Sequence, residues 1–246
     1  MSLQEILDDI EDYLEYRRDE GATSIEVDPE VVKGLSKPAR RSEPAPNPEV
    51  PGTGPAAESS LDDVAAQIAV CTKCSLHETR TKTVPGQGSS SPEIMFIGEA
   101  PGADEDRQGV AFIGRAGQLL TKMIEAMGFT REEVFIGNIL KCRPPGNRTP
   151  MPDEMETCMP YLKEQIRLLK PKVIIALGAT AVKGLLDVRT GITKLRGTWM
   201  AFENIDLMPT YHPAYLLRNP SAKKDVWEDL KEVLHFLGRE VPDHRK

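Results

Sequence analysis

The chain has 246 residues and a formal net charge of −7 at pH 7, which allows one domain of about 150–200 residues and an additional segment. The acidity is uneven: residues 1–60 hold 14 acidic and 6 basic side chains and the remaining 186 residues hold 24 and 25, so the near-neutral remainder argues against a large basic groove. Because no stretch approaches the roughly 18 apolar residues of a membrane span and the first residues do not read as a secretory signal, we expect a cytoplasmic protein with no membrane partner.

Residues 1–20 predict an acidic amphipathic helix, which begins with a capping box formed by Ser2 and Glu5. Its apolar face carries Leu3, Ile6, Leu7, Ile10 and Leu14. This face is either a weakly docked, solvated surface or a binding surface for a partner protein. Residues 21–60 predict a flexible linker, because six prolines fall between residues 37 and 60 among almost no large apolar side chains.

Residues 61–246 predict one α/β domain. Apolar runs predict strands over residues 94–97, 134–139, 173–177 and 207–211. Amphipathic stretches predict helices over residues 60–68, 116–127, 153–169, 179–186 and 225–237. Since strands that alternate with helices favour a parallel sheet covered on both faces, we predict a three-layer α/β/α fold with a central four-stranded parallel sheet.

Polar side chains lie at the ends of three predicted strands. Glu99 follows the first strand, Asn138 lies near the end of the second, and His212 follows the fourth. Each alone has an ordinary structural interpretation, such as a turn cap or a structural histidine. Because the carboxyl ends of parallel strands meet at one edge, where α/β proteins bind their ligands, we expect the three to converge on a site. The Gly- and Pro-containing turn over residues 98–102 allows the backbone to approach a ligand closely.

The four cysteines, Cys71, Cys74, Cys142 and Cys158, form a C-x2-C pair and a C-x15-C pair. A reducing compartment argues against two structural disulfides. Four thiolates suit either zinc or an iron–sulfur cluster, and the spacing is not that of a zinc ribbon. Chemistry alone leaves both metals open, together with the alternative of unrelated buried thiols. The cysteines are remote in sequence from the strand-end residues, which favours a structural role over electron transfer.

Four segments together resemble the family-four uracil-DNA glycosylases, the thermostable iron–sulfur type of the uracil-DNA glycosylase superfamily. They read Gly98-Glu-Ala-Pro-Gly102, Gly109-Val-Ala-Phe-Ile-Gly-Arg-Ala-Gly-Gln-Leu-Leu120, Asn138-Ile-Leu-Lys-Cys-Arg-Pro-Pro145 and His212-Pro-Ala-Tyr-Leu-Leu-Arg-Asn-Pro220. The resemblance extends from about Cys71 to the last helix and does not cover residues 1–60. It implies a monofunctional DNA repair enzyme that hydrolyses the N-glycosidic bond of uracil in DNA, releases free uracil and leaves an abasic site.

The resemblance also implies a uracil pocket and a structural [4Fe-4S] cluster. The pocket residues would be Gly98, Glu99, Ala100, Pro101, Gly102, Glu105, Phe112, Asn138 and His212. The cluster would be held by Cys71, Cys74, Cys142 and Cys158. Glu99, Asn138 and His212 would be the catalytic residues.

The resemblance gives individual roles to five side chains. Phe112 would stack on the flipped base, and Asn138 would donate to uracil O4 and accept from N3–H. His212, as a neutral imidazole, would donate to the O2 atom. Glu99 would orient or deprotonate the attacking water and favour the cationic sugar, and Glu105 would close the C5 side of the pocket against the methyl group of thymine.

DNA contacts are expected from loops at the same edge of the sheet. Candidates are Arg143, Arg148, Lys194, Arg196 and Arg218 for phosphates, with Leu216 and Leu217 as wedges in the vacated base stack. Solvated surface charge is the alternative for each basic residue. The implied partner is uracil-containing DNA, single- or double-stranded, bound by a nucleoid-associated monomer whose N-terminal helix recruits a replication or repair protein. Gly102 argues against family five, and the competing function is a non-hydrolytic iron–sulfur DNA-binding or redox module.

Overall fold

The computed structural model describes residues 60–188 and 190–242. The predicted helix over 1–20 and almost all of the predicted linker over 21–60 therefore lie outside the described residues. Within the described part the strands form one sheet in the order β1-β3-β2-β4-β6-β5. The four central strands are parallel: β2 (Ile94–Gly98), β3 (Phe135–Asn138), β4 (Val173–Leu177) and β6 (Ile205–Thr210). The edge strands β1 (Gln87–Gly88) and β5 (Met200–Phe202) are antiparallel to their neighbours.

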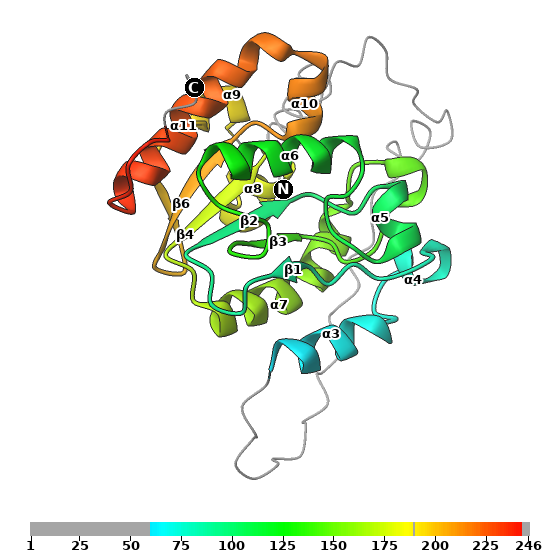
Figure 1. Cartoon of the computed structure of the whole chain (residues 1–246). Helices are drawn as coiled ribbons and strands as arrows, with labels where there is room; N and C mark the ends of the chain where they lie inside the picture. Colours follow the sequence, from blue (N-terminus) through cyan, green and yellow to red (C-terminus); the bar gives the residue numbers. More distant parts are fainter. Residues whose placement is uncertain (1–59, 189, 243–246) are drawn as a thin grey trace, which may run out of the picture.

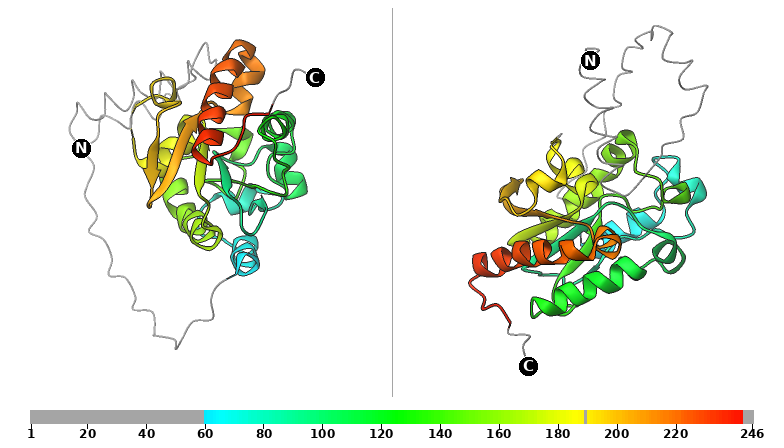
Figure 2. Two further views of the ribbon diagram at one scale, coloured as in Figure 1. Left: turned by 60° about the vertical axis from the view of Figure 1, so that its left-hand side comes forward. Right: turned by 90° about the horizontal axis from the view of Figure 1, so that it is seen from above.

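The predicted four-stranded parallel core is confirmed, and helices cover both of its faces (Figure 1). Helices α6 (Arg115–Ala126) and α11 (Lys223–Phe236) lie on one face, and α7 (Pro152–Leu169) and α8 (Ala179–Leu186) lie on the other (Figure 2). The connections β2–β3 and β3–β4 run in opposite directions across the sheet, and right-handed crossovers then place their helices on opposite faces. This is the predicted three-layer α/β/α arrangement. The two edge strands were not predicted.

Shorter elements connect these layers. They are α3 (Leu61–Ala69), α4 (Leu76–Thr79), α5 (Ala103–Gln108), η1 (Pro145–Asn147), α9 (Ile192–Leu195), α10 (Pro213–Arg218) and η2 (Pro220–Ala222). Helix α3 begins with a capping box, in which the Ser60 hydroxyl accepts from the Asp63 N–H at 3.1 Å and the Asp63 carboxylate accepts from the Ser60 N–H at 2.8 Å. Val64 and Ile68 of α3 pack on Tyr161 of α7 in a small separate core.

The central strands are apolar because both of their faces are covered. Ile94, Met95, Phe96 and Ile97 of β2 are all fully buried, and each such side chain contributes roughly 1.5–3 kcal/mol on burial. This core fixes the carboxyl ends of β2, β3 and β6, where the polar residues lie. None of the helices in the described part of the chain is long and apolar enough to cross a bilayer.

Candidate active site

Gly98 is the point around which the candidate site is built. It ends β2 and is paired in register with Asn138 of β3. A Cβ atom at Gly98 would lie 2.5 Å from Asn138 Oδ1 and 2.5 Å from Phe112 Cζ, far inside van der Waals contact. The missing side chain therefore lets the Asn138 amide and the Phe112 ring meet over the strand end.

Asn138 presents an unused hydrogen-bond acceptor at this point. Its side chain is 1% exposed, and among the described residues its Oδ1 is the one buried side-chain nitrogen or oxygen atom without a hydrogen-bond partner. An unsatisfied buried acceptor costs about 1–3 kcal/mol, so such atoms are rare in native proteins and call for an explanation. A ligand that donates a hydrogen bond over Gly98 would satisfy it.

Phe112 forms the aromatic wall beside Asn138. Phe112 is 6% exposed, and the centroid of its ring lies 5.7 Å from that of the His212 ring, with 36° between the two planes. The backbone of Phe112 has φ 51°, a left-handed conformation that costs a non-glycine residue about 1–2 kcal/mol. Helix α6 approaches this backbone so closely that a Cβ at Gly117 would lie 1.9 Å from the Phe112 carbonyl carbon. The backbone turn that carries the Phe112 ring is thus tightly constrained.

His212 has a defined tautomer. It precedes α10, and its Nδ1 accepts a hydrogen bond from the Ala214 N–H at 3.1 Å, so a neutral ring carries its proton on Nε2. Burial lowers the pKa of His212 to about 4, and the positive charge of Arg218 acts in the same direction. The imidazole is therefore neutral at pH 7 and offers one N–H donor. Gly178 makes room for it, because a Cβ there would lie 3.0 Å from His212 Cβ.

Glu99 is held at the same edge by its backbone. The β2–β3 pairing continues past the strands, since the Gly98 and Glu99 carbonyls accept from the N–H groups of Ile139 and Leu140 at 2.9 and 3.0 Å. Glu99 is partly exposed. Beyond it, Gly102 caps the N-terminus of α5. The turn that was predicted to line a ligand pocket therefore lies directly beside Asn138.

Glu105 makes contacts that the sequence did not suggest. Glu105 is 9% exposed, and its Oε1 accepts from the N–H groups of Ile113 and Gly114 at 2.9 and 2.8 Å. Gly102 is close by, because a Cβ there would lie 2.8 Å from Glu105 Oε2. One carboxylate oxygen of Glu105 therefore binds the turn that carries Phe112. Its expected contact with the C5 side of the base stays a prediction.

Two of the arginines expected to contact phosphate are paired with carboxylates of the protein itself. Arg148 donates to both carboxylate oxygens of Glu154, at 2.9 and 2.6 Å, and that carboxylate also accepts from the N–H of Met151, the N-cap residue of α7, at 2.8 Å. Arg196 pairs with the buried Asp229, whose Oδ2 accepts from the Thr210 hydroxyl at 2.6 Å. Both arginines therefore form ion pairs that hold the fold, and the Arg148 side chain is still 39% exposed. Their expected contact with phosphate stays a prediction.

The other basic candidates are Arg143, Lys194 and Arg218. Arg143 donates to Asn147 Oδ1 at 2.6 Å, and Lys194 and Arg218 are exposed. Leu216 is 1% exposed and packs in the core, so its expected role as a wedge is wrong in this structure. Leu217 beside it is 39% exposed.

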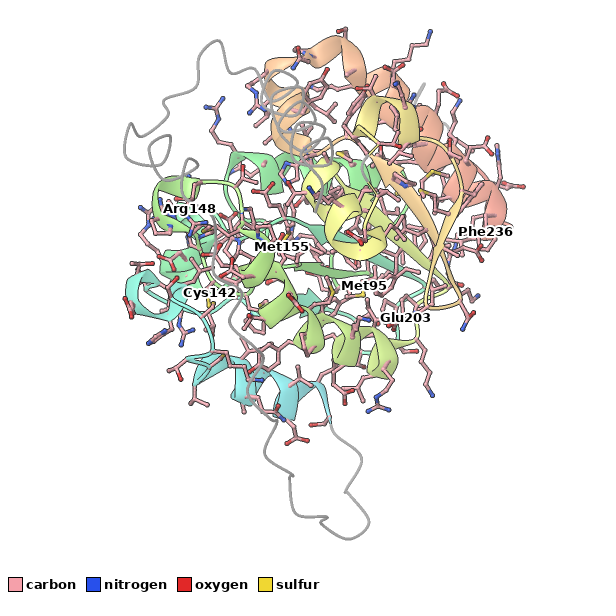
Figure 3. The ribbon with its side chains drawn as sticks, turned by 180° about the vertical axis from the view of Figure 1, so that it is seen from behind. Met95, Cys142, Arg148, Met155, Glu203 and Phe236 are labelled. Carbon is pink, nitrogen blue, oxygen red and sulfur yellow. The ribbon has the colours of Figure 1, made fainter. Side chains whose placement is uncertain are left out.

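The four cysteines line one cavity, which also includes Lys73, Arg80 and Tyr161 in its wall. Its empty volume is about 360 Å³, including space open to solvent. All four thiols are free, and Arg80 donates to Cys142 Sγ at 3.1 Å. Cys142 and Arg148 lie at the end of the molecule away from Phe236 (Figure 3). In the part of the chain that is described, no three Cys, His, Asp or Glu side chains are grouped so as to hold a metal ion.

Comparison with known proteins identifies the family. The Uracil DNA glycosylase superfamily profile matches residues 85–231. The type-4 uracil-DNA glycosylase of Archaeoglobus fulgidus is 42% identical over 74% of this chain and 96% of its own length, and that of Thermotoga maritima is 43% identical over 74% and 97%. The chain belongs to the type-4 uracil-DNA glycosylases. The type-4 protein of Saccharolobus solfataricus is 46% identical over 72% of this chain and 87% of its own length.

Membership of the type-4 family agrees with the distinction drawn from Gly102. A type-5 uracil-DNA glycosylase of Pyrobaculum aerophilum is only 28% identical, over 62% of this chain and 74% of its own length. The family resemblance seen in the sequence is thus confirmed, and the alternative of a non-hydrolytic module is not favoured.

Two basic residues near the site of this glycosylase, Lys141 and Arg131, were not predicted from the sequence. Lys141 is 1% exposed, and its Nζ donates to the Asn138 carbonyl at 2.9 Å and to Gln165 Oε1 at 2.7 Å. Burial lowers its pKa to about 8. A lysine that follows the apolar pair Ile139-Leu140 and directly precedes Cys142 was the available signal. The other residue, Arg131, left no comparable pattern in the sequence.

Proposed function

We propose that this chain excises uracil from DNA by hydrolysis of the N-glycosidic bond, releasing free uracil and leaving an abasic site for base excision repair. The observation that carries the proposal is the unpartnered Oδ1 of Asn138, buried over Gly98 beside Phe112 and His212. A uracil base held there supplies the missing donor. The target base inside a duplex is inaccessible, so the enzyme must flip it out of the stack.

The edge of uracil fits the amide of Asn138. Oδ1 accepts from N3–H, and Nδ2 donates to O4. Cytosine presents an acceptor at N3 and a donor at N4, so both pairings would be reversed. Each mismatched polar group in a buried pocket costs about 1–3 kcal/mol. The Phe112 ring stacks on the face of the base and holds it against Gly98.

His212 acts on the charge that develops during bond cleavage. As the bond from the sugar to N1 breaks, positive charge builds on the sugar and negative charge on uracil O2. The Nε2–H of the neutral imidazole donates to O2, a preorganised donor of the kind that lowers such barriers most. Glu99 orients or deprotonates the attacking water and stabilises the cationic sugar. Water oxygen bonds to C1′, and uracil leaves with the pair of electrons and takes up a proton.

We propose that DNA lies over the edge formed by Arg143, Lys194 and Arg218, with Leu217 entering the vacated base stack. The exposure of Lys194, Arg218 and Leu217 supports this arrangement. The protein is proposed to act as a monomer in the cytoplasm at the nucleoid, and a repair or replication partner for residues 1–20 stays a prediction from sequence.

The test of the activity is cleavage of a labelled oligonucleotide with a single uracil, followed by alkali to break the chain at abasic sites. We expect cleavage of the uracil strand and none of matched strands with cytosine or thymine at the same position. Absence of cleavage by purified protein with its metal site filled would contradict the proposed activity and return the non-hydrolytic module to consideration.

We further infer that Cys71, Cys74, Cys142 and Cys158 hold a [4Fe-4S] cluster. Zinc draws four sulfurs to about 2.3 Å from one atom, whereas a cluster spreads its four thiolates over separate irons. Four free thiols line one cavity, and the resemblance to the iron–sulfur type of glycosylase favours the cluster over zinc. The cluster would cross-link α7 to the segment after α3 and the loop after β3.

Loss of one cysteine should remove the cluster. We expect the wild-type protein to be brown, with broad absorbance at about 400 nm and about four irons per chain, and Cys158→Ala to be colourless. Because metal binding contributes directly to folding, the variant should melt about 10 °C lower. Thr157→Ala is the control, since Thr157 lines the same cavity without a thiol. A colourless wild type with one zinc per chain would contradict the assignment.

A further inference from the structure

The turn that carries Phe112, residues 111–114, is hydrogen-bonded on two sides by charged side chains. Arg131 donates from Nη2 to the Ala111 carbonyl at 2.7 Å and from Nη1 to the Phe112 carbonyl at 3.1 Å. Glu105 accepts from the two following N–H groups of the turn at 2.9 and 2.8 Å. Four successive residues of the turn thus have a main-chain group bound to one of these two side chains.

Arg131 is itself anchored to helix α6. Its Nη1 also donates to the Thr121 hydroxyl at 3.0 Å, and that hydroxyl donates to the Gly117 carbonyl at 3.1 Å. Gly117 is the residue whose missing side chain lets α6 touch the Phe112 backbone. The guanidinium therefore ties the turn to the helix that it packs on.

The turn needs such support because of its backbone. Phe112 has φ 51°, and an unfavourable backbone conformation persists only where the surroundings over-determine it. Arg131 supplies several donors from one planar group, which a lysine cannot reproduce. Glu105 binds the other end of the turn, so neither end is free to relax to an ordinary conformation.

We propose that Arg131, together with Glu105, is a positioning residue that fixes the Phe112 ring in its stacking geometry before the base arrives. This inference rests on the proposed function, because it concerns the ring that stacks on uracil. Arg131 acts through the main chain of the turn without touching the base. A ring held in place in advance spares the cost of ordering it when the flipped nucleotide enters.

The first arm of the test measures the turn without DNA. Arg131→Met keeps an unbranched side chain but removes the donors to the turn. Amide hydrogen exchange, followed by mass spectrometry of peptides over residues 109–118, should become at least about tenfold faster in this variant. Arg167→Met is the matched control, because Arg167 is an exposed arginine of α7 paired with Glu164, and it should leave this exchange unchanged.

The second arm is a double-mutant cycle with Phe112→Leu on the uracil oligonucleotide. In the wild-type background Arg131→Met should lower kcat/KM by about tenfold to hundredfold. In the Phe112→Leu background it should lower kcat/KM by less than about threefold, because the ring that it positions is already absent. A merely structural role would give the same loss in both backgrounds.

An equal loss in both backgrounds, or unchanged exchange in the turn, would overturn the inference. If wild-type protein does not cut uracil-containing DNA, the proposed function fails, but the exchange arm still decides whether Arg131 holds the turn. If Arg131→Met does not fold, Arg131→Lys takes its place. This variant keeps the charge but cannot donate to both the Ala111 and the Phe112 carbonyl, and it should show the same faster exchange.

Discussion

Replacing His212 with alanine is expected to lower the single-turnover rate of uracil release by about 10²–10³-fold, the range found when one preorganised donor to a developing anion is removed. The geometry provides a neutral ring with Nδ1 occupied by the Ala214 N–H and Nε2–H left as the donor. Because this donor matters most as charge develops on O2, KM should change little. Rapid-mixing kinetics on a uracil oligonucleotide measures both. His235→Ala, at an exposed position of α11, is the control.

The pH dependence of the rate distinguishes a neutral His212 that donates a hydrogen bond from a protonated His212 that acts as an acid. The pKa of His212 is lowered to about 4 by burial and by Arg218, below its ordinary value of 6.5, so the ring stays neutral between about pH 5 and pH 9. We expect the His212-dependent part of the rate to be flat through pH 6.5. A rate that falls as pH rises through about 6.5 would show a protonated ring and contradict the neutral-donor role.

The lowered pKa of His212 also makes the free energy of unfolding depend on pH. Between about pH 4 and 6.5 the unfolded chain binds a proton at His212 and the folded chain does not, so the free energy of unfolding rises with pH in this window. The contribution of His212 is therefore complete above about pH 6.5 and is lost as the pH falls to 4. Denaturant unfolding of wild type and His212→Ala at several pH values measures it, and the variant should show a shallower slope.

Replacing Asn138 with aspartate is the second change with a large expected effect. The site is 1% exposed, and aspartate keeps an acceptor for N3–H but loses the donor to O4 and adds a buried charge. At about 1–3 kcal/mol for each lost pairing, kcat/KM for uracil should fall by about a hundredfold or more. Two acceptor oxygens can also receive the N4 amino group of cytosine, so the preference for uracil over cytosine should narrow.

Parallel assays on uracil and cytosine oligonucleotides give this preference directly. Asn204→Asp is the matched control, because Asn204 is an exposed residue of the β5–β6 hairpin with φ 68°, a conformation that aspartate also tolerates. An Asn138→Asp variant with wild-type rate and wild-type selectivity would refute the assignment of Asn138 as the residue that reads the base.

The parallel core was predictable because its signals are local. The apolar run over β2 is long enough to mark a strand that is buried on both faces, and the capping box at Ser60 marks the start of α3. The edge strands β1 and β5 have only two and three residues. Such short segments become strands only through pairing with distant β3 and β6, which no local pattern reports.

For the candidate site, the sequence by itself determined which residues follow the strand ends, the type-4 family and the four thiols. Only the tertiary structure decided that Gly98 brings Phe112 onto Asn138, and that Asn138 keeps an unused acceptor. It also decided that Arg131 and Glu105 bind the Phe112 turn and that Leu216 is buried. Alternation and spacing fix where a side chain sits along its own element. Burial and hydrogen-bond partners depend on elements far apart in the chain, and these meet only when the sheet and its two helical layers have packed.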